Sequence, residues 1–124
     1  MHVILTDREA DLMEVLWDRG PSTVAEVQER LPDELAYTTV LTILRTLETK
    51  GFVTHQEEGR AHRYVARVAR DDARRSALRD LSRKLFKGSA SLLLTHLVED
   101  EKLSAAELRR LRELLEQRTR KDKG

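Results

Sequence analysis

The sequence of 124 residues contains no cysteine. This absence excludes a disulfide framework, a thiolate metal site, a cysteine nucleophile and thiol-based redox sensing. Aromatic residues are also few, with one tryptophan, two tyrosines and two phenylalanines, so the core must be mainly aliphatic. The hydrophobic content of 40% is sufficient for a core of this size, and the length fits one domain or two small units.

Long apolar runs are absent as well. No run approaches the roughly 18 residues that a membrane span requires, and the N-terminus lacks a basic segment followed by a hydrophobic one. We therefore expect a cytoplasmic protein without membrane insertion.

The net charge of +1 conceals an uneven distribution of charge along the chain. Residues 1–36 hold three basic and nine acidic residues, whereas residues 37–70 hold six basic and three acidic ones. The balance moves from −6 to +3, and residues 71–124 add fourteen basic and ten acidic residues. A cationic middle third favours a nucleic-acid surface, because such a surface needs local rather than global charge.

The segment 36–51 predicts a helix with an aliphatic face and a hydroxyl-rich face. The aliphatic residues are Val40, Ile43, Leu44 and Leu47, and the polar ones are Thr38, Thr42, Arg45, Thr46 and Thr49. Threonine costs a helix roughly half a kcal/mol per residue relative to alanine. Short hydroxylated side chains around an arginine suit a helix that lies against phosphates or base edges. The alternative is a threonine-rich face that is only solvated.

Helix-start signals precede this segment twice. Thr6 with Glu9, and Thr23 with Glu26, have the spacing of a capping box. Together they predict three short helices, which end at Gly20-Pro21, at Pro32 and at Gly51.

Two β-leaning runs, 52–56 and 61–65, flank a turn that contains Gly59, which predicts a hairpin. Three short helices followed by a hairpin predict a winged helix-turn-helix domain over residues 1–70. The fold class is therefore mainly α with a small β-hairpin. In such a domain the third helix enters the major groove of DNA, and the hairpin reaches the adjacent backbone or minor groove.

Residues 71–124 predict a helical dimerisation domain with a basic tail. A third capping box, Ser104 with Glu107, begins its last helix. These helices are too few and too short to bury their own apolar stripes, so we expect a homodimer. The residues expected at its interface are Leu78, Leu81, Leu85, Leu93, Leu97, Leu108, Leu111 and Leu115.

Eight residues are predicted to contact double-stranded DNA. They are Thr38, Thr39, Thr42 and Arg45 in the major groove, Arg60 and Arg63 from the hairpin, and Tyr37 and Lys50 at phosphates. Arg67 is a weaker phosphate candidate. The alternatives are that Arg60 and Arg63 pair with Glu57 or Glu58 and that the Tyr37 ring packs against the preceding helix.

His55 and His62 are expected across the hairpin from one another. Two histidines without a third ligand are more typical of a solvated surface than of a metal site or a pH switch. We therefore expect neither a metal nor a cofactor.

An enzymatic function has little support in the sequence. The carboxylates are spread among Lys and Arg along helix faces, and no phosphate loop, nucleophile elbow or metal-ligand spacing occurs, so we expect no catalytic residue. Two regulatory alternatives are a winged-helix module that binds only protein and a repressor released by a small molecule bound in the dimer core.

Six motifs in order carry a resemblance to a known family. They are Leu16-Trp17, Thr23-Val24-Ala25-Glu26-Val27, Ala36-Tyr37-Thr38-Thr39-Val40, Leu47-Glu48-Thr49-Lys50-Gly51, Gly59-Arg60 and Phe86-Lys87-Gly88-Ser89. With these motifs the chain resembles the penicillinase-repressor (BlaI/MecI/CopY) family over nearly its whole length. The resemblance implies a dimeric bacterial repressor on a dyad-symmetric operator, often of β-lactam-resistance genes.

The resemblance also implies a sensor protease as a partner. In the best-known members of the family, an antibiotic-activated membrane sensor leads to a cut between Asn and Phe in the C-terminal domain. Matching from Gly88 and from Leu103-Ser104 places that bond at His96-Leu97, where the residues differ. Cleavage with another preference, or another route of derepression, is therefore expected. The copper-responsive branch uses a cysteine-rich site, so thiolate copper sensing is excluded here.

Overall fold

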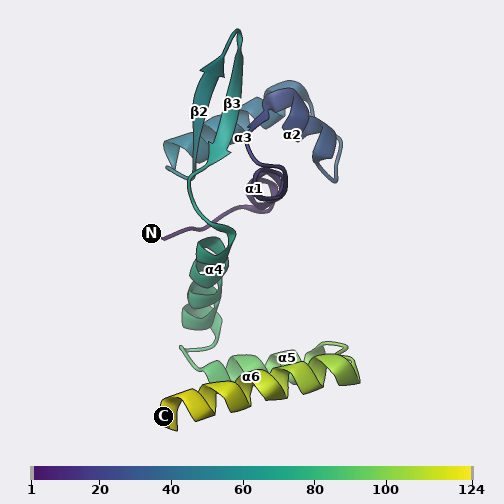
Figure 1. The fold of residues 1–124 in the computed structure, drawn as a ribbon, viewed down its shortest axis with the longest axis vertical. Helices are drawn as coiled ribbons and strands as arrows, with labels where there is room; N and C mark the ends of the chain where they lie inside the picture. Colours follow the sequence, from purple (N-terminus) through teal and green to yellow (C-terminus); the bar gives the residue numbers. More distant parts are fainter. Residues whose placement is uncertain (1, 124) are drawn as a thin grey trace. The chain divides into compact units, whose positions relative to one another are not determined.

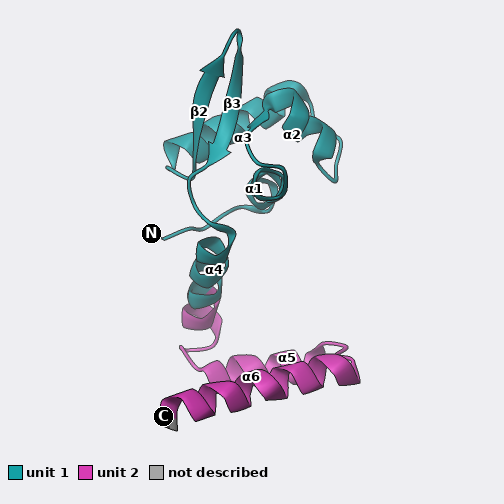
Figure 2. Ribbon diagram, in the orientation of Figure 1, with its two compact units in different colours: residues 1–80 teal, residues 81–124 magenta. Residues whose placement is uncertain are grey.

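The computed structural model describes residues 2–123, and the chain divides into two compact units between Asp80 and Leu81 (Figure 2). Unit 1 contains α1 (Asp7–Arg19), β1 (Ser22–Thr23), α2 (Val24–Arg30), α3 (Tyr37–Thr49), β2 (Val53–Glu58), β3 (Ala61–Ala66) and most of α4 (Arg70–Leu85). Unit 2 contains the end of α4, α5 (Ala90–Asp100) and α6 (Ala105–Lys123). The division therefore falls inside α4 rather than at its beginning.

Capping boxes begin the first two helices, as predicted. The Thr6 hydroxyl accepts from the Glu9 N–H at 3.2 Å, and the Thr6 N–H donates to the Glu9 carboxylate at 2.9 Å. Thr23 and Glu26 repeat the arrangement at 3.3 and 3.0 Å. Each box satisfies amide groups that have no partner inside the helix, which fixes where α1 and α2 begin.

The core of unit 1 is mainly aliphatic, with Tyr64 and Phe52 as its buried aromatic residues, and α3 contributes to it. Val40, Leu44 and Leu47 are fully buried, and they belong to one cluster with Leu12 and Met13 of α1. The single tryptophan, Trp17, is half-buried at the edge of this cluster, where its indole N–H donates to the Val68 carbonyl at 2.9 Å. The apolar face predicted for 36–51 is therefore confirmed, and it fixes which face of α3 remains outside.

The sheet has three antiparallel strands in the order β1-β3-β2. Glu58 pairs with Ala61, which leaves Gly59 and Arg60 as a two-residue turn at the tip of the wing, the β2–β3 hairpin. Gly59 has φ 62°, a left-handed conformation that such turns require and that glycine adopts at no steric cost. The sequence did not predict β1, because two residues are too few to show a period of two. Helices α1–α3 followed by the wing form the predicted winged helix-turn-helix, and the chain is mainly helical (Figure 1).

Besides the end of α4, unit 2 consists of the helices α5 and α6, which line one groove together (Figure 1). The third capping box is present, because the Glu107 N–H donates to the Ser104 hydroxyl at 3.0 Å and the Ser104 N–H reaches the Glu107 carboxylate at 3.4 Å. None of residues 81–122 is buried. Unit 2 therefore has apolar side chains but no interior of its own.

The described helices include none that is both long enough and apolar enough to cross a membrane.

Candidate nucleic-acid interface

The outer face of α3 is lined by hydroxyls around one arginine. Its exposed residues include Thr38, Thr39, Thr42, Arg45, Thr46 and Thr49. The N-cap of α3 is Ala36, and no side chain caps the helix there. By contrast, a hydroxyl caps the N-termini of α1, α2, α5 and α6. The start of α3 therefore leaves its first amide groups for a partner outside the chain.

The threonine hydroxyls donate their protons to the helix itself. Thr42 donates to the Thr38 carbonyl at 2.9 Å, Thr46 to the Thr42 carbonyl at 3.0 Å, and Thr49 to the Arg45 carbonyl at 3.0 Å. This bond to the carbonyl four residues earlier is a known habit of threonine in helices. What these side chains offer an external partner is consequently an acceptor oxygen and a methyl group.

Half of the basic residues in 37–70 pair with acidic residues of the first helices. Lys50 contacts Glu9 at 2.8 Å, Arg63 contacts Glu26 at 3.1 Å, and Arg70 contacts Glu14 at 2.7 Å and Asp18 at 2.5 Å. Arg45, Arg60 and Arg67 form no ion pair within residues 2–123 and are exposed. Ion pairs within unit 1 therefore neutralise three of the six basic residues in 37–70. The other three, all arginines, keep their charge available to an external partner.

These internal pairs change the acidity of the carboxylates. Burial raises the pKa of Glu9, but the contacts with Lys50 and Thr6 outweigh it, so the pKa lies below its usual value. Hydrogen bonds from Arg19 and from the Thr23 backbone lower the pKa of Glu26 to about 2. Glu58, bonded to the Arg63 guanidinium at 2.5 Å, raises the pKa of Arg63. Since Arg63 also donates to the Pro21 carbonyl at 3.2 Å, it anchors the wing to the segment before α2.

A hollow of about 330 Å³ separates the wing from the first turns of α2 and α3. Its lining includes Tyr37 and Arg45 of α3, and Arg60 and His62 of the wing. Tyr37 is 50% exposed, and it shares this lining with Val24 and Ala25 of α2. Two of the three arginines without an ion pair therefore line one concavity beside the threonine face.

The structure brings most of the predicted DNA contacts together and separates two of them. Thr38, Thr39, Thr42 and Arg45 share the outer face of α3, and Arg60 lies at the tip of the wing. Lys50 and Arg63 are held by carboxylates instead. The pairing of Arg63 with Glu58 is the alternative that the sequence offered, whereas no sequence signal identified Glu9 and Glu26, which lie far from Lys50 and Arg63 along the chain.

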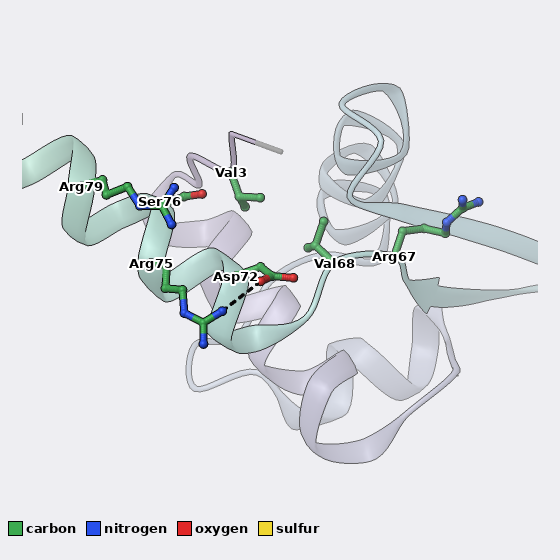
Figure 3. Close-up of a pocket in the computed structure, with 7 residues that line it drawn as sticks. All are labelled: Val3, Arg67, Val68, Asp72, Arg75, Ser76 and Arg79. Atoms are coloured by element: carbon green, nitrogen blue, oxygen red, sulfur yellow. Dashed lines mark ion pairs between the residues drawn. The ribbon is translucent and has the colours of Figure 1, made fainter. Parts of the chain in front are cut away.

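A second hollow, of about 280 Å³, lies against the first part of α4 (Figure 3). Val3, Arg67 and Val68 line it together with Asp72, Arg75, Ser76 and Arg79 of α4. Arg75 and Asp72 form an ion pair at 3.6 Å. Three arginines and one aspartate leave the lining with a net positive charge, although the Arg67 side chain points away from the other three (Figure 3).

Comparison with protein families identifies the group to which this architecture belongs. The model of the penicillinase repressor family matches residues 5–117. The chain belongs to the penicillinase repressor family. The family predicted from the six motifs is therefore confirmed.

Three relatives in this family have names that describe regulators. The transcriptional regulator BlaI of Mycobacterium tuberculosis (strain H37Rv) is 39% identical over 99 residues, which cover 77% of this chain and 72% of the relative. The penicillinase repressor of Bacillus licheniformis is 24% identical over 96% of this chain and 94% of its own length. The methicillin resistance regulatory protein MecI of Staphylococcus aureus (strain N315) is 23% identical over 90% and 92%.

A solved structure supports the fold. A MarR family protein from Bacillus stearothermophilus superposes with a TM-score of 0.51 and 19% identity, covering 94% of this chain and 77% of that one. The family and the fold together mark the chain as a relative of winged-helix transcriptional regulators.

Proposed function

We propose that this chain is a homodimeric, sequence-specific transcriptional repressor that binds a dyad-symmetric operator with α3 in the major groove. The exposed threonine and arginine face of α3, beside Arg60 of the wing, is the observation that supports it most directly. Regulation of β-lactam-resistance or related stress genes is the role we propose, in line with the names of the relatives. The chain then has no catalytic residue and acts in the cytoplasm, where the DNA is.

The threonine face would recognise bases through hydroxyl oxygens that accept hydrogen bonds and through methyl groups. Because the hydroxyl protons of Thr42, Thr46 and Thr49 are already donated within α3, their oxygens accept from the amino groups of adenine or cytosine. Their methyl groups suit contact with the methyl of thymine. Arg45 is the donor of this face and fits the two acceptors of guanine.

Phosphate contacts would fix the register of the helix in the groove. Arg60, Tyr37 and the uncapped start of α3 lie around one hollow, which suits the DNA backbone beside the major groove. Lys50 and Arg63 are secondary phosphate contacts in this proposal, since each shares its charge with a carboxylate. These two therefore add less to binding than Arg60.

A second copy of the chain is the partner we propose for unit 2. Of the leucines predicted at the interface, Leu81, Leu85, Leu97, Leu108 and Leu115 of unit 2 are exposed, as is Leu78 in unit 1, while Leu93 and Leu111 are half-buried. An apolar groove of about 460 Å³ between α5 and α6, lined by Leu94, Leu97, Leu103 and Leu111, continues this surface. Since no described residue of unit 2 is buried, burial against a second copy would supply the missing core, and two α3 helices would match a dyad-symmetric operator.

Cleavage of unit 2 is one route by which such a repressor would be released. The His96–Leu97 bond lies inside α5. There the Nδ1 atom of His96 lies 3.1 Å from a carboxylate oxygen of Asp100, and the centroids of the His96 and Phe86 rings are 5.5 Å apart. A sensor protease that cuts there would divide α5 and remove part of the proposed interface. The alternative is release by a small anionic molecule, for which the hollow of Figure 3 offers arginines.

Quantitative footprinting on the promoter region next to the gene tests the DNA-binding proposal. The double variant Thr42→Ala, Arg45→Ala should lose at least about tenfold in operator affinity, since a bidentate base contact such as that proposed for Arg45 is worth about 1–3 kcal/mol. Arg60→Ala should weaken binding to all sequences and lower the salt slope by about one unit. Alanine favours helices, so α3 is retained in the double variant.

The matched control is Arg118→Ala on α6, which removes one exposed arginine far along the chain from α3 and should leave operator affinity unchanged. If the double variant of α3 binds the operator as well as the wild type does, α3 is not the reading helix.

A further inference from the structure

Three metal-ligating side chains meet on one face of the wing. In the register of the hairpin, Glu57 pairs with His62 and His55 pairs with Tyr64, so His55, Glu57 and His62 point to the same side of the sheet. One ligand atom from each lies within 4.8 Å of the other two. The structure thus supplies Glu57 as the third ligand that two histidines alone lack.

The two imidazole rings lie close together and differ in solvent exposure. Their ring centroids are 4.4 Å apart, with planes inclined by 13°. The side chain of His55 is 32% exposed, whereas His62 and Glu57 are exposed. A tetrahedral Zn²⁺ with ligand bonds of about 2.0–2.1 Å needs donor atoms closer than 4.8 Å, and rotation of the two exposed side chains provides that approach.

A carboxylate already contacts one of the two ring nitrogens of His55. The Nδ1 atom of His55 lies 2.7 and 2.8 Å from the two carboxylate oxygens of Glu48, on α3. Nε2 is then the ring nitrogen left for a ligand. A carboxylate on the far nitrogen of a histidine is the usual support of a metal ligand, because it fixes the tautomer and orients the ring. This contact is an observation independent of the cluster itself.

We propose that His55, Glu57 and His62 bind a divalent transition-metal ion of the zinc type, with Glu48 as the positioning residue behind His55. Two imidazoles and one carboxylate are nitrogen and oxygen donors that suit Zn²⁺ rather than Mg²⁺ or Ca²⁺. The three side chains leave the fourth position to water. The ion connects β2 to β3 and, through Glu48, connects the wing to α3. This site goes beyond the proposed function and does not rest on it.

Calorimetric titration of the full-length protein with Zn²⁺ alone, at neutral pH, tests the site. The wild type should bind one ion per chain, and binding should raise the melting temperature reported by Trp17 fluorescence. His55→Gln and His62→Gln should each lower Zn²⁺ affinity at least tenfold. Glu48→Gln, which leaves all three ligands in place, should lower it about 10- to 100-fold.

The matched control is His96→Gln on α5, which removes a histidine that also contacts a carboxylate but lies outside the cluster. It should bind Zn²⁺ as the wild type does. Circular dichroism of each variant without metal separates loss of a ligand from loss of the fold. The proposal is overturned if millimolar Zn²⁺ does not bind the wild type, if His62→Gln keeps the wild-type affinity, or if His96→Gln loses it.

Discussion

Unit 1 and unit 2 differ in how far they bury their apolar side chains. In unit 1, aliphatic residues of α1, α2 and α3 close around one another, and Leu12, Leu44 and Leu47 are fully buried. In unit 2, the leucines of α5 and α6 are half-buried at most. The first unit therefore buries its apolar side chains in its own contacts, whereas the described residues of the second leave theirs at the surface.

Ion pairs follow the same division. In unit 1 several of them join residues far apart in sequence, such as Lys50 with Glu9 and Arg63 with Glu26. Among the described ion pairs of unit 2, His96–Asp100 and Arg118–Asp122 each lie within one helix, four residues apart. Charges therefore fasten one element to another in unit 1 but support single helices in unit 2.

Truncating a leucine in each unit should give the largest contrast. Leu44→Ala should lower the free energy of unfolding by about 2–5 kcal/mol, because it leaves a cavity in a closed core. Leu115→Ala, at a residue 56% exposed, should instead raise the dissociation constant of the proposed dimer. Denaturant titration followed by Trp17 fluorescence measures the first, and sedimentation equilibrium measures the second.

Protein concentration separates the two effects. The loss in Leu44→Ala should be the same at every concentration, whereas the effect of Leu115→Ala should disappear where both proteins are monomeric. A wild-type chain that is monomeric at micromolar concentration with α5 and α6 fully formed would refute the need for a second copy.

Removing one cation from each unit should give an intermediate effect. Lys50→Met leaves the Glu9 carboxylate, whose side chain is 5% exposed, without its charged partner, and should cost about 1–3 kcal/mol. Arg118→Met breaks a pair whose side chains are 78% and 65% exposed, and should change stability by less than about 0.5 kcal/mol. Thermal unfolding of both variants is the measurement, and equal losses would contradict the comparison.

The acid dependence of two capping boxes should give the smallest effect. The pKa of Glu26 is lowered from 4.5 to about 2 in the folded chain. The ionised carboxylate therefore stabilises the folded state fully above about pH 4.5, and this stabilisation is lost as the pH falls toward 2. Glu26→Gln should therefore lower the melting temperature at neutral pH by a few degrees, and wild type and variant should converge near pH 2.

Glu107→Gln, in the capping box of α6, is the matched comparison, because Glu107 forms no ion pair within residues 2–123 and its bond to the Ser104 N–H is longer, at 3.4 Å. Glu107→Gln should lower the melting temperature at neutral pH by less than Glu26→Gln does. A difference between Glu26→Gln and wild type that grows toward acid would show that the Arg19 contact does not stabilise the fold.

Local sequence signals predicted the elements well. The capping boxes at Thr6 and Thr23 fixed two helix starts, and the turn around Gly59 fixed the hairpin, because each depends on residues close together in the chain. The apolar face of α3 followed from its period in the same way.

Contacts between distant segments could not be predicted in this way. The sequence predicted Lys50 and Arg63 as DNA contacts and offered only Glu57 or Glu58 as a partner of Arg63, yet folding also places the carboxylates of Glu9 and Glu26 against these two cations. Likewise, Glu57 joins His55 and His62 only through the register of the hairpin, which spacing alone does not specify.

In the proposed complex, the threonines of α3 meet the duplex with much of their rotational freedom already lost. Each hydroxyl of Thr42, Thr46 and Thr49 is bonded to a carbonyl one turn earlier, so its rotamer is fixed within the helix itself. Ordering flexible side chains is one of the costs of association. A groove-facing helix that has incurred this cost during folding can bind with short side chains and few contacts.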